Sequence, residues 1–132
     1  MHKNYFLGKR EWAYKNVKPR ILAERYLDSL LKKETHEYKI TCMGGLVRFV
    51  TICSGIAHAA YHLRQNDHFT KDWKRLNWYA RYKPTGIDFK KTPEIEKMIE
   101  LSEVLSNGIP QVRVDWYLHD GKIYFGEMTF YT

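Results

Sequence analysis

The sequence predicts an α+β fold, in which an antiparallel β-sheet of four or more strands carries one long helix on one face. Three stretches support this prediction. Residues 38–53 and residues 111–132 each have the pattern of two strands joined by a tight turn, and residues 92–106 between them have helical spacing. No internal repeat or flexible linker divides the 132 residues. We therefore expect a single domain, with residues 1–19 as an arm and residues 20–132 as the body.

The arm mixes aromatic side chains with basic ones. Such a mixture can bind single-stranded nucleic acid, because rings stack on bases while Lys and Arg meet phosphates. The same composition is typical of an arm whose rings pack on the body of the protein, which is the arrangement we expect here. Residues 21–27, ILAERYL, then have the composition of a short buried strand.

A first hairpin is predicted at residues 38–53. Residues 38–42 and 46–53 are rich in strand-forming side chains, and the turn between them contains Gly44 and Gly45. The two cysteines, Cys42 and Cys53, do not make a disulfide framework and are expected to be reduced and half-buried. In the less regular stretch 54–77, residues 71–76 are expected to form a single helical turn.

The histidines of this stretch raise the question of a zinc site. His58 and His62 are four residues apart and would share one face of a helix, but the acidic residue of the zinc-protease pattern is missing between them. We therefore expect His58, His62 and His68 to be loop or groove residues near anionic ligands rather than metal ligands.

Residues 92–106 predict the one long helix. Thr92 is a good N-cap, Pro93 suits the first helical position, and Asn107-Gly108 ends the helix. Apolar residues recur at helical spacing along it: Ile95, Met98, Ile99, Leu101, Val104 and Leu105.

The closing stretch predicts a second hairpin, because two runs rich in Val, Tyr, Trp, Phe and Ile flank His119-Asp120-Gly121. A two-residue loop would place Asp115 opposite Gly126 and turn Glu127 to the other side of the sheet. A three-residue loop, with its glycine in the left-handed conformation, would pair position 115 with 125 and position 113 with 127.

The three-residue loop is the register we expect, because it separates the apolar from the polar side chains. The apolar set would face the core: Val112, Val114, Trp116 and Met128. The polar set would share the other face: Arg113, Asp115, Glu127 and Thr129. Two carboxylates beside an arginine suit Mg²⁺ and a phosphate group, since Mg²⁺ prefers oxygen ligands and arginine offers phosphate a planar fork. The alternative is a solvated sheet face with one Arg–Glu pair across the strands.

Composition limits the possible classes of protein. Hydrophobic residues make up 44% and aromatic residues 15%, which is enough for a packed core. The net charge of +7 favours anionic partners such as nucleotides, nucleic acid, acidic lipid or acidic sugars, although a basic surface alone would give the same number. No stretch has the apolar length of a membrane helix, and the first residues lack the apolar core of a signal peptide. The cytoplasm is therefore the expected location.

Several stretches together resemble one family. They are REWAYKNVKPRILAERYL (10–27), EYKITCMGGLVRFV (37–50), DWKRLNW (72–78), LSNGIP (105–110) and VRVDWYLHDGKIYFGEMTFY (112–131). They resemble the ATP-grasp proteins of the teichuronopeptide-biosynthesis (TupA-like) type, which are bacterial cell-surface polysaccharide proteins often labelled glycosyltransferases. The resemblance covers nearly the whole chain and implies the C-terminal subdomain of an ATP-grasp unit.

The resemblance implies a role for particular residues. Asp115 and Glu127 match the Mg²⁺-binding acids, and Thr129 stands where most ATP-grasp enzymes have the Asn that is the third ligand. Arg113 would face phosphate or an acyl phosphate, with Arg64 as a further candidate for substrate or phosphate contact. The adenine would meet the backbone of a hinge formed by Glu24, Arg25, Tyr26 and Leu27. Glu37 would accept hydrogen bonds from the ribose hydroxyls.

The implied activity is Mg²⁺- and ATP-dependent. ATP would phosphorylate a carboxylate, and an amine or thiol would then displace phosphate, as in a carboxylate ligase. The implied partners are a nucleotide and an anionic, sugar or peptide cell-wall substrate, and nucleic acid is disfavoured. A glycosyltransferase is the rival within the same setting, although no sugar-nucleotide motif is visible. The alternative outside it is a non-enzymatic basic module that binds RNA or another polyanion.

The resemblance begins at the arm before the hinge, so the preceding ATP-grasp subdomain, with its phosphate-binding lysine and Gly-rich loop, is expected to be missing. Half of a nucleotide site should bind ATP weakly, because a good site buries most of its ligand. Whether such a chain is itself an active enzyme is left open. Sheet edge or apolar surface left uncovered should favour self-association.

Overall fold

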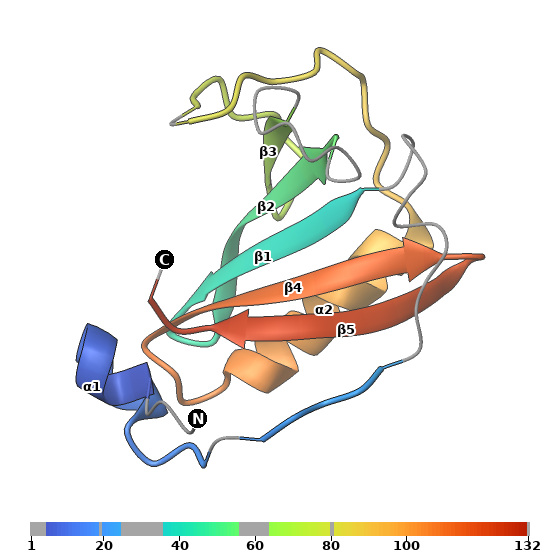
Figure 1. The fold of residues 1–132 in the computed structure, drawn as a ribbon. Helices are drawn as coiled ribbons and strands as arrows, with labels where there is room; N and C mark the ends of the chain where they lie inside the picture. Colours follow the sequence, from blue (N-terminus) through green and yellow to red (C-terminus); the bar gives the residue numbers. More distant parts are fainter. Residues whose placement is uncertain (1–4, 19, 25–35, 56–63, 80, 132) are drawn as a thin grey trace.

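The computed structural model describes residues 5–18, 20–24, 36–55, 64–79 and 81–131. Its centre is a five-stranded antiparallel sheet in the order β3-β2-β1-β4-β5, with helix α2 packed on one face (Figure 1). The strands are β1 (Glu37–Met43), β2 (Leu46–Ser54), β3 (Gln65–Thr70), β4 (Gln111–His119) and β5 (Lys122–Thr129). The helices are α1 (Tyr5–Lys9), the short 3₁₀ turn η1 (Trp12–Tyr14) and α2 (Pro93–Ser106). The α+β prediction is therefore confirmed.

Helix α2 begins and ends where its local sequence predicts. The Thr92 side chain accepts a hydrogen bond from the backbone N–H of Ile95, and Pro93 is the first helical residue. Gly108 follows the C-cap with a φ of 75°, a conformation that glycine adopts without strain. Five side chains are buried: Ile95, Met98, Ile99, Ser102 and Ser106. Val104 and Leu105 fit the apolar spacing but are exposed on the outer side of the helix.

The hydrophobic core lies between α2 and the sheet. Alternate residues of β4, Val112, Val114 and Trp116, point into it as predicted. The indole N–H of Trp116 donates to Ser102 Oγ at 2.8 Å, which in turn donates to the carbonyl of Met98 at 2.7 Å. These bonds satisfy the buried indole N–H of Trp116 and the buried hydroxyl of Ser102. They also fix the helix against the centre of β4, which sends the intervening residues of that strand to the opposite face.

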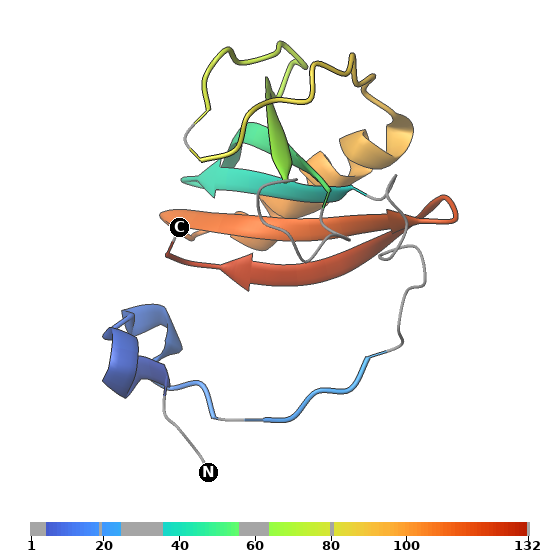
Figure 2. The ribbon, with the colours of Figure 1, turned by 45° about the horizontal axis from the view of Figure 1, so that its top comes forward.

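We call that opposite side the open face. Figure 2 shows α2 above the sheet and the segment of residues 5–24 below it. The strand registers and the alternation of side chains assign the residues of this face. They are Glu37, Lys39 and Thr41 of β1, Phe49, Thr51 and Cys53 of β2, Asn66, His68 and Thr70 of β3, Arg113, Asp115 and Tyr117 of β4, and Glu127 and Thr129 of β5.

The three-residue loop predicted for the closing hairpin is wrong. His119 pairs with Lys122, so the loop has two residues, Asp120 and Gly121, with φ angles of 49° and 69°. Two successive positive φ angles are typical of the type I′ turn that an Asp-Gly pair favours, because its twist matches that of the strands.

A bulge in β5 nevertheless brings the polar side chains together. Trp116 pairs with Phe125, but Val114 pairs with Met128, so two residues of β5, Gly126 and Glu127, lie opposite Asp115. The extra residue shifts the register by one position. Arg113 therefore pairs with Thr129, and the predicted common face is confirmed by a different geometry.

Two local predictions are wrong. Residues 21–24 form no strand: Ile21 is 99% exposed and Leu22 79% exposed, while residues 25–27 lie outside the described residues. Residues 71–76 form no helical turn. The chain instead reverses after β3, and Arg75 makes an isolated bridge to Phe69. Strand β3 itself was not predicted, because its sequence QNDHFT is mostly polar.

Tyr14 packs the arm on the body. Tyr14 contacts the rings of Phe130 and Tyr131, and its hydroxyl accepts a hydrogen bond from the backbone N–H of Phe130 at 3.2 Å. Trp12 packs instead against Phe6 within the arm. The predicted packing of arm rings on the body is thus confirmed for Tyr14.

Both cysteines are free, as predicted, and they are buried rather than half-buried. Within the described part of the chain, no helix is long and apolar enough to cross a membrane.

Candidate carboxylate and cation cluster on the open face

Asp115 is the centre of the cluster. Its side chain is 0% exposed and binds two cationic side chains. Arg113 forms a fork, with Nε donating to Oδ1 at 2.6 Å and Nη2 donating to Oδ2 at 2.8 Å. Lys39 Nζ donates to Oδ2 at 2.7 Å. A buried carboxylate is tolerated only when it is paired in this way, because removal from water otherwise costs several kcal/mol, about 3 to 5 when one partner is lost.

Lys39 joins Asp115 to a second carboxylate. Its Nζ lies 2.8 Å from Glu37 Oε1, and that oxygen also accepts a hydrogen bond from the Tyr117 hydroxyl at 3.2 Å. Burial lowers the pKa of Lys39, but the bonds to Asp115 and Glu37 outweigh it, so the pKa lies above its ordinary value. Burial, together with the neighbouring Glu37, raises the pKa of Tyr117, which keeps its hydroxyl protonated as a donor.

Arg113 extends the cluster to β5. Its Nη2 donates to Thr129 Oγ1 at 3.0 Å and to Glu127 Oε1 at 3.3 Å, and Thr129 Oγ1 donates to the same Glu127 oxygen at 3.2 Å. The Glu127 side chain is 66% exposed. The structure therefore brings together all four polar residues of the closing hairpin, and Glu37 joins them through Lys39.

Neither Lys39 nor Tyr117 was predicted as a member of this site. A sequence signal for Lys39 exists, because it stands two positions after Glu37 on one strand and therefore shares its face. Its pairing with Asp115 depends on β1 lying beside β4, which no local pattern reveals.

The side chains of the cluster are of the kind that bind magnesium, but Asp115 is already paired with two cations. Asp115, Glu127 and Thr129 offer the oxygen ligands that Mg²⁺ prefers, and two cations face three carboxylates. Both oxygens of Asp115, however, already accept hydrogen bonds from cations. Within the described ranges no three acidic, His or Cys side chains lie close enough together to hold a metal. An ion that binds Asp115 is therefore repelled by two cations already in contact with the same carboxylate, unless one of them moves away.

The remaining predicted nucleotide contacts are placed differently. Glu24 is exposed on the segment that runs below the open face, and Arg25, Tyr26 and Leu27 lie outside the described residues. Arg64 is half-buried directly before β3, which β2 and β1 separate from β4. The structure thus brings none of these described residues to the Asp115 cluster.

His68 is a buried strand residue rather than the loop or groove residue that we predicted. Its Nδ1 lies 2.9 Å from Thr51 Oγ1, and its ring stacks on Trp78 with centroids 4.3 Å apart. Burial lowers the pKa of His68, which keeps the ring neutral at pH 7. His58 and His62 lie outside the described residues.

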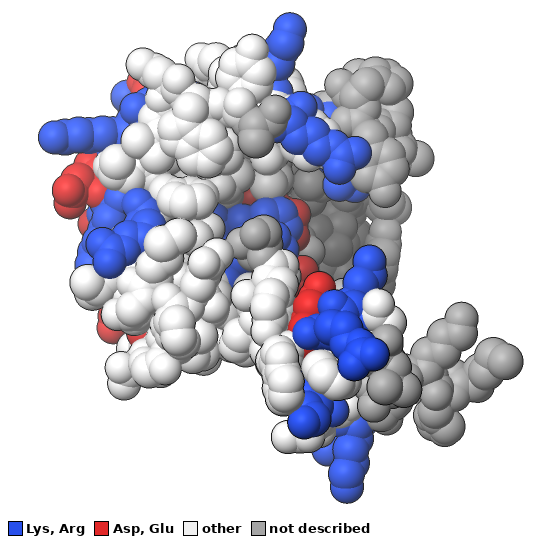
Figure 3. Space-filling model, turned by 90° about the vertical axis from the view of Figure 1, so that its left-hand side faces the viewer, with Lys and Arg blue, Asp and Glu red and all other residues white. Residues whose placement is uncertain are grey.

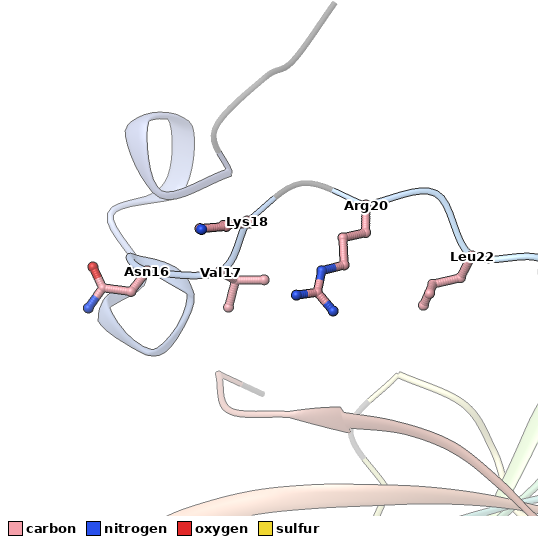
Figure 4. Close-up of a pocket in the computed structure, with 5 residues that line it drawn as sticks. All are labelled: Asn16, Val17, Lys18, Arg20 and Leu22. Atoms are coloured by element: carbon pink, nitrogen blue, oxygen red, sulfur yellow. The ribbon is translucent and has the colours of Figure 1, made fainter.

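A separate hollow of 640 Å³ lies along the N-terminal segment, lined by Asn16, Val17, Lys18, Arg20 and Leu22. Figure 4 shows the side chains of Val17, Arg20 and Leu22 pointing from this segment toward the end of β5. Of the predicted site residues that the structure describes, none lines this hollow.

The comparisons with known proteins address the whole chain. The model of one protein family, described as TupA-like ATPgrasp, matches residues 1–132. No curated protein and no solved structure matches the chain. Because the match spans every residue, it covers both the open-face cluster and the segments around it. The chain belongs to the TupA-like ATPgrasp family.

Proposed function

We propose that this chain binds Mg²⁺-ATP on its open face and acts in the biosynthesis of bacterial cell-surface polysaccharide. ATP-grasp families generally use ATP and Mg²⁺, and this chain belongs to one of them. The observation that carries the proposal is the cluster of Arg113, Asp115, Glu127 and Thr129, which two paired strands hold on one face. Rigid strands are a suitable support, because they fix the distances between ligand-binding groups.

Each residue then has a defined task. Asp115, Glu127 and Thr129 would hold the ion, which neutralises charge on the phosphate groups when it is bound. Arg113 would turn its free edge toward a phosphate or an acyl phosphate. Glu37 would accept hydrogen bonds from the ribose hydroxyls. Arg64 would make a further contact to the substrate or its phosphate.

The adenine would lie against the backbone of the hinge, Glu24 to Leu27. The reaction that we propose is the transfer of a phosphoryl group from ATP to a carboxylate, followed by attack of an amine or thiol that releases phosphate. The acceptor would be an anionic, sugar or peptide cell-wall substrate. A bound-nucleotide structure with adenine away from residues 24–27 would contradict this placement.

The charge distribution gives little support to a polyanion-binding module. Figure 3 shows Lys and Arg side chains in several separate places on one side of the molecule, with acidic side chains between some of them. Lys39 and Arg113, the two cations of the cluster, already pair with carboxylates. RNA binding that falls steeply with salt would nevertheless favour such a module over the nucleotide site.

Calorimetric titration with Mg²⁺-ATP tests the proposal. We expect Glu127→Gln to weaken binding by roughly tenfold or more. Loss of a residue that only hydrogen-bonds to a metal ligand typically costs about tenfold or more in affinity, and loss of the ligand itself should cost at least as much. The fold should be almost unaffected, since Glu127 is exposed and Arg113 keeps its other partners. Glu103→Gln is the matched control, because this carboxylate also pairs with a cation, Lys71, but lies on α2. Equal affinity in the parent and Glu127→Gln would contradict the metal site.

Asp115→Asn is the second variant, and its interpretation needs a stability measurement. An amide at this position leaves the half-buried Lys39 and Arg113 beside a neutral group, and the loss of these charged hydrogen bonds costs about 1 to 3 kcal/mol. We therefore expect a lower melting temperature as well as weaker Mg²⁺-ATP binding. The titration is read at a temperature at which the variant is still folded.

A further inference from the structure

Lys39 contacts Asp115, the buried carboxylate to which we assign the metal ion. Its ammonium lies 2.7 Å from Asp115 Oδ2 and 2.8 Å from Glu37 Oε1, so one cation bridges two carboxylates from neighbouring strands. We propose that Lys39 is a built-in counter-ion that blocks the binding of a free metal ion and moves to the phosphate groups when the metal arrives with a nucleotide. This inference rests on the proposed function and adds a coupling between its two ligands.

Lys39 is the cation that can leave, and Arg113 is the one that stays. Arg113 holds Asp115 through two hydrogen bonds and is also fixed by Thr129 and Glu127. Lys39 makes a single bond to Asp115, and its side chain is 23% exposed. A lysine ammonium is a point charge on a flexible stem, whereas the planar guanidinium fork loses several bonds at once.

The displacement of Lys39 from Asp115 by a metal ion has different consequences with and without a nucleotide. A free divalent ion at Asp115 would place two cations side by side, and their repulsion opposes binding. A nucleotide supplies phosphate oxygens, which are good acceptors for a lysine ammonium. Glu37 can hold Lys39 near the site during the exchange, because Lys39 Nζ lies 2.8 Å from Glu37 Oε1 and this ion pair does not involve Asp115. The metal and the nucleotide are therefore expected to bind cooperatively, and Lys39 carries the coupling.

Titration with Mn²⁺ alone, followed by the electron paramagnetic resonance of the free ion, tests this proposal. Mn²⁺ accepts the same oxygen ligands as Mg²⁺. We expect Lys39→Met to bind Mn²⁺ about tenfold more tightly than the parent, because a neighbouring charge changes the affinity of a carboxylate for a cation by one to three orders of magnitude. Lys39→Arg keeps the charge and should bind Mn²⁺ as the parent does. Lys71→Met removes a lysine that pairs with Glu103 on α2 and is the matched control for net charge.

In the presence of ATP, the substitution of Lys39 should change the binding affinity in the opposite direction. With ATP present, Lys39→Met is expected to bind the metal–nucleotide complex about tenfold more weakly than the parent, because it lacks the phosphate contact. Lys39→Gln is the second neutral variant. Its amide can still donate hydrogen bonds to Asp115 and Glu37, so it tests the charge in a protein that keeps these contacts.

Two results would overturn the inference. The first is a Mn²⁺ affinity of Lys39→Met and Lys39→Gln within twofold of the parent. The second is a tighter Mn²⁺ affinity that survives the further change Asp115→Asn, since the ion would then bind elsewhere. A failure of the proposed function looks different: the parent, Glu127→Gln and Lys39→Met would all fail to bind Mg²⁺-ATP, whatever the Mn²⁺ titration gives.

Discussion

Among the residues that the structure describes, two carboxylates are completely buried, and their partners indicate different tasks. Asp67 binds Arg75 and accepts hydrogen bonds from the backbone N–H and the hydroxyl of Thr85, at 3.1 and 2.7 Å. Its partners come from the chain that directly follows β3, so Asp67 fixes that segment in place. Asp115 instead binds Lys39, which belongs to a strand far away in the sequence. Its side chain lies on the open face of the sheet, where we propose that a ligand binds.

Two histidines, the buried His68 and the half-buried His36, should make the stability depend on pH. Burial lowers the pKa of His36 and of His68, and the charge of Asp67 offsets part of this effect. The unfolded chain therefore takes up protons near the ordinary pKa of about 6.5, whereas the folded protein does so only at lower pH. Stability is fully present above that value and is lost as the pH falls. We expect a lower melting temperature at about pH 5.5 than at pH 7.5.

The histidine variants show whether these two rings are responsible. His36 Nδ1 lies 3.0 Å from Ser54 Oγ and His68 Nδ1 lies 2.9 Å from Thr51 Oγ1, so each ring has a hydroxyl partner. Replacing both histidines by glutamine should flatten the change in melting temperature with pH. An equally large change in the double variant would assign the effect to other groups.

At the scale of an element, the closing hairpin shows what local sequence can and cannot predict. Helix α2 was predictable because Thr92, Pro93 and Gly108 act through bonds and backbone angles within one turn. The set of residues on the open face of β4 was predictable from alternation alone. The bulge was not, because it depends on how closely Gly126 approaches the neighbouring strand. Lys39 was missed because its partner Asp115 belongs to another hairpin, and the local sequence does not reveal that the two hairpins lie side by side.

Gly126 should be required for the bulge. A Cβ atom at this position would lie 2.9 Å from the carbonyl oxygen of Asp115 and 3.0 Å from Cε2 of Tyr117. The first of these is a backbone atom of the paired strand and cannot move aside alone. We expect Gly126→Ala to lower the free energy of unfolding by about 1 to 3 kcal/mol, as other overpacked sites do. Urea denaturation measures the change.

A second glycine provides the control for this substitution. A Cβ at Gly8 in α1 would meet no atom within 4 Å, so Gly8→Ala should leave the stability unchanged or slightly higher. If Gly126→Ala unfolds at the same urea concentration as the parent, the bulge does not need a glycine. The affinity of the Gly126→Ala protein for a metal ion tests whether the bulge positions Glu127, which is the second residue of the bulge.

At the scale of the whole molecule, the sheet separates two environments. Helix α2 covers the apolar face, and the open face carries a row of paired residues across four strands, Asp115, Lys39, Thr51 and His68. The row is charged at β4 and β1 and neutral at β2 and β3, where His68 stacks on Trp78. A charged ligand that carries phosphate groups would therefore meet its partners at the β4 side of this face.

The segment that runs below the open face should make the protein self-associate. Ile21 is 99% exposed and Leu22 79% exposed, and Val17 is also exposed. In addition β5 is an edge strand of the sheet, and its own residue Phe125 is half exposed. When a second molecule covers apolar side chains and strand edges of this kind, the free energy falls and association is favoured. We expect light scattering to give an average mass that rises with protein concentration.

Replacing the two most exposed side chains locates the contact. Ile21→Ser with Leu22→Ser should shift the protein toward monomer, because the segment then offers little apolar area to a second molecule. Val104→Ser is the matched control, since Val104 is also exposed but lies on the outer side of α2. An equal loss of association in this control would place the contact on the helix. A parent protein that stays strictly monomeric at high concentration would show that the segment of residues 16–24 needs no second copy to cover it.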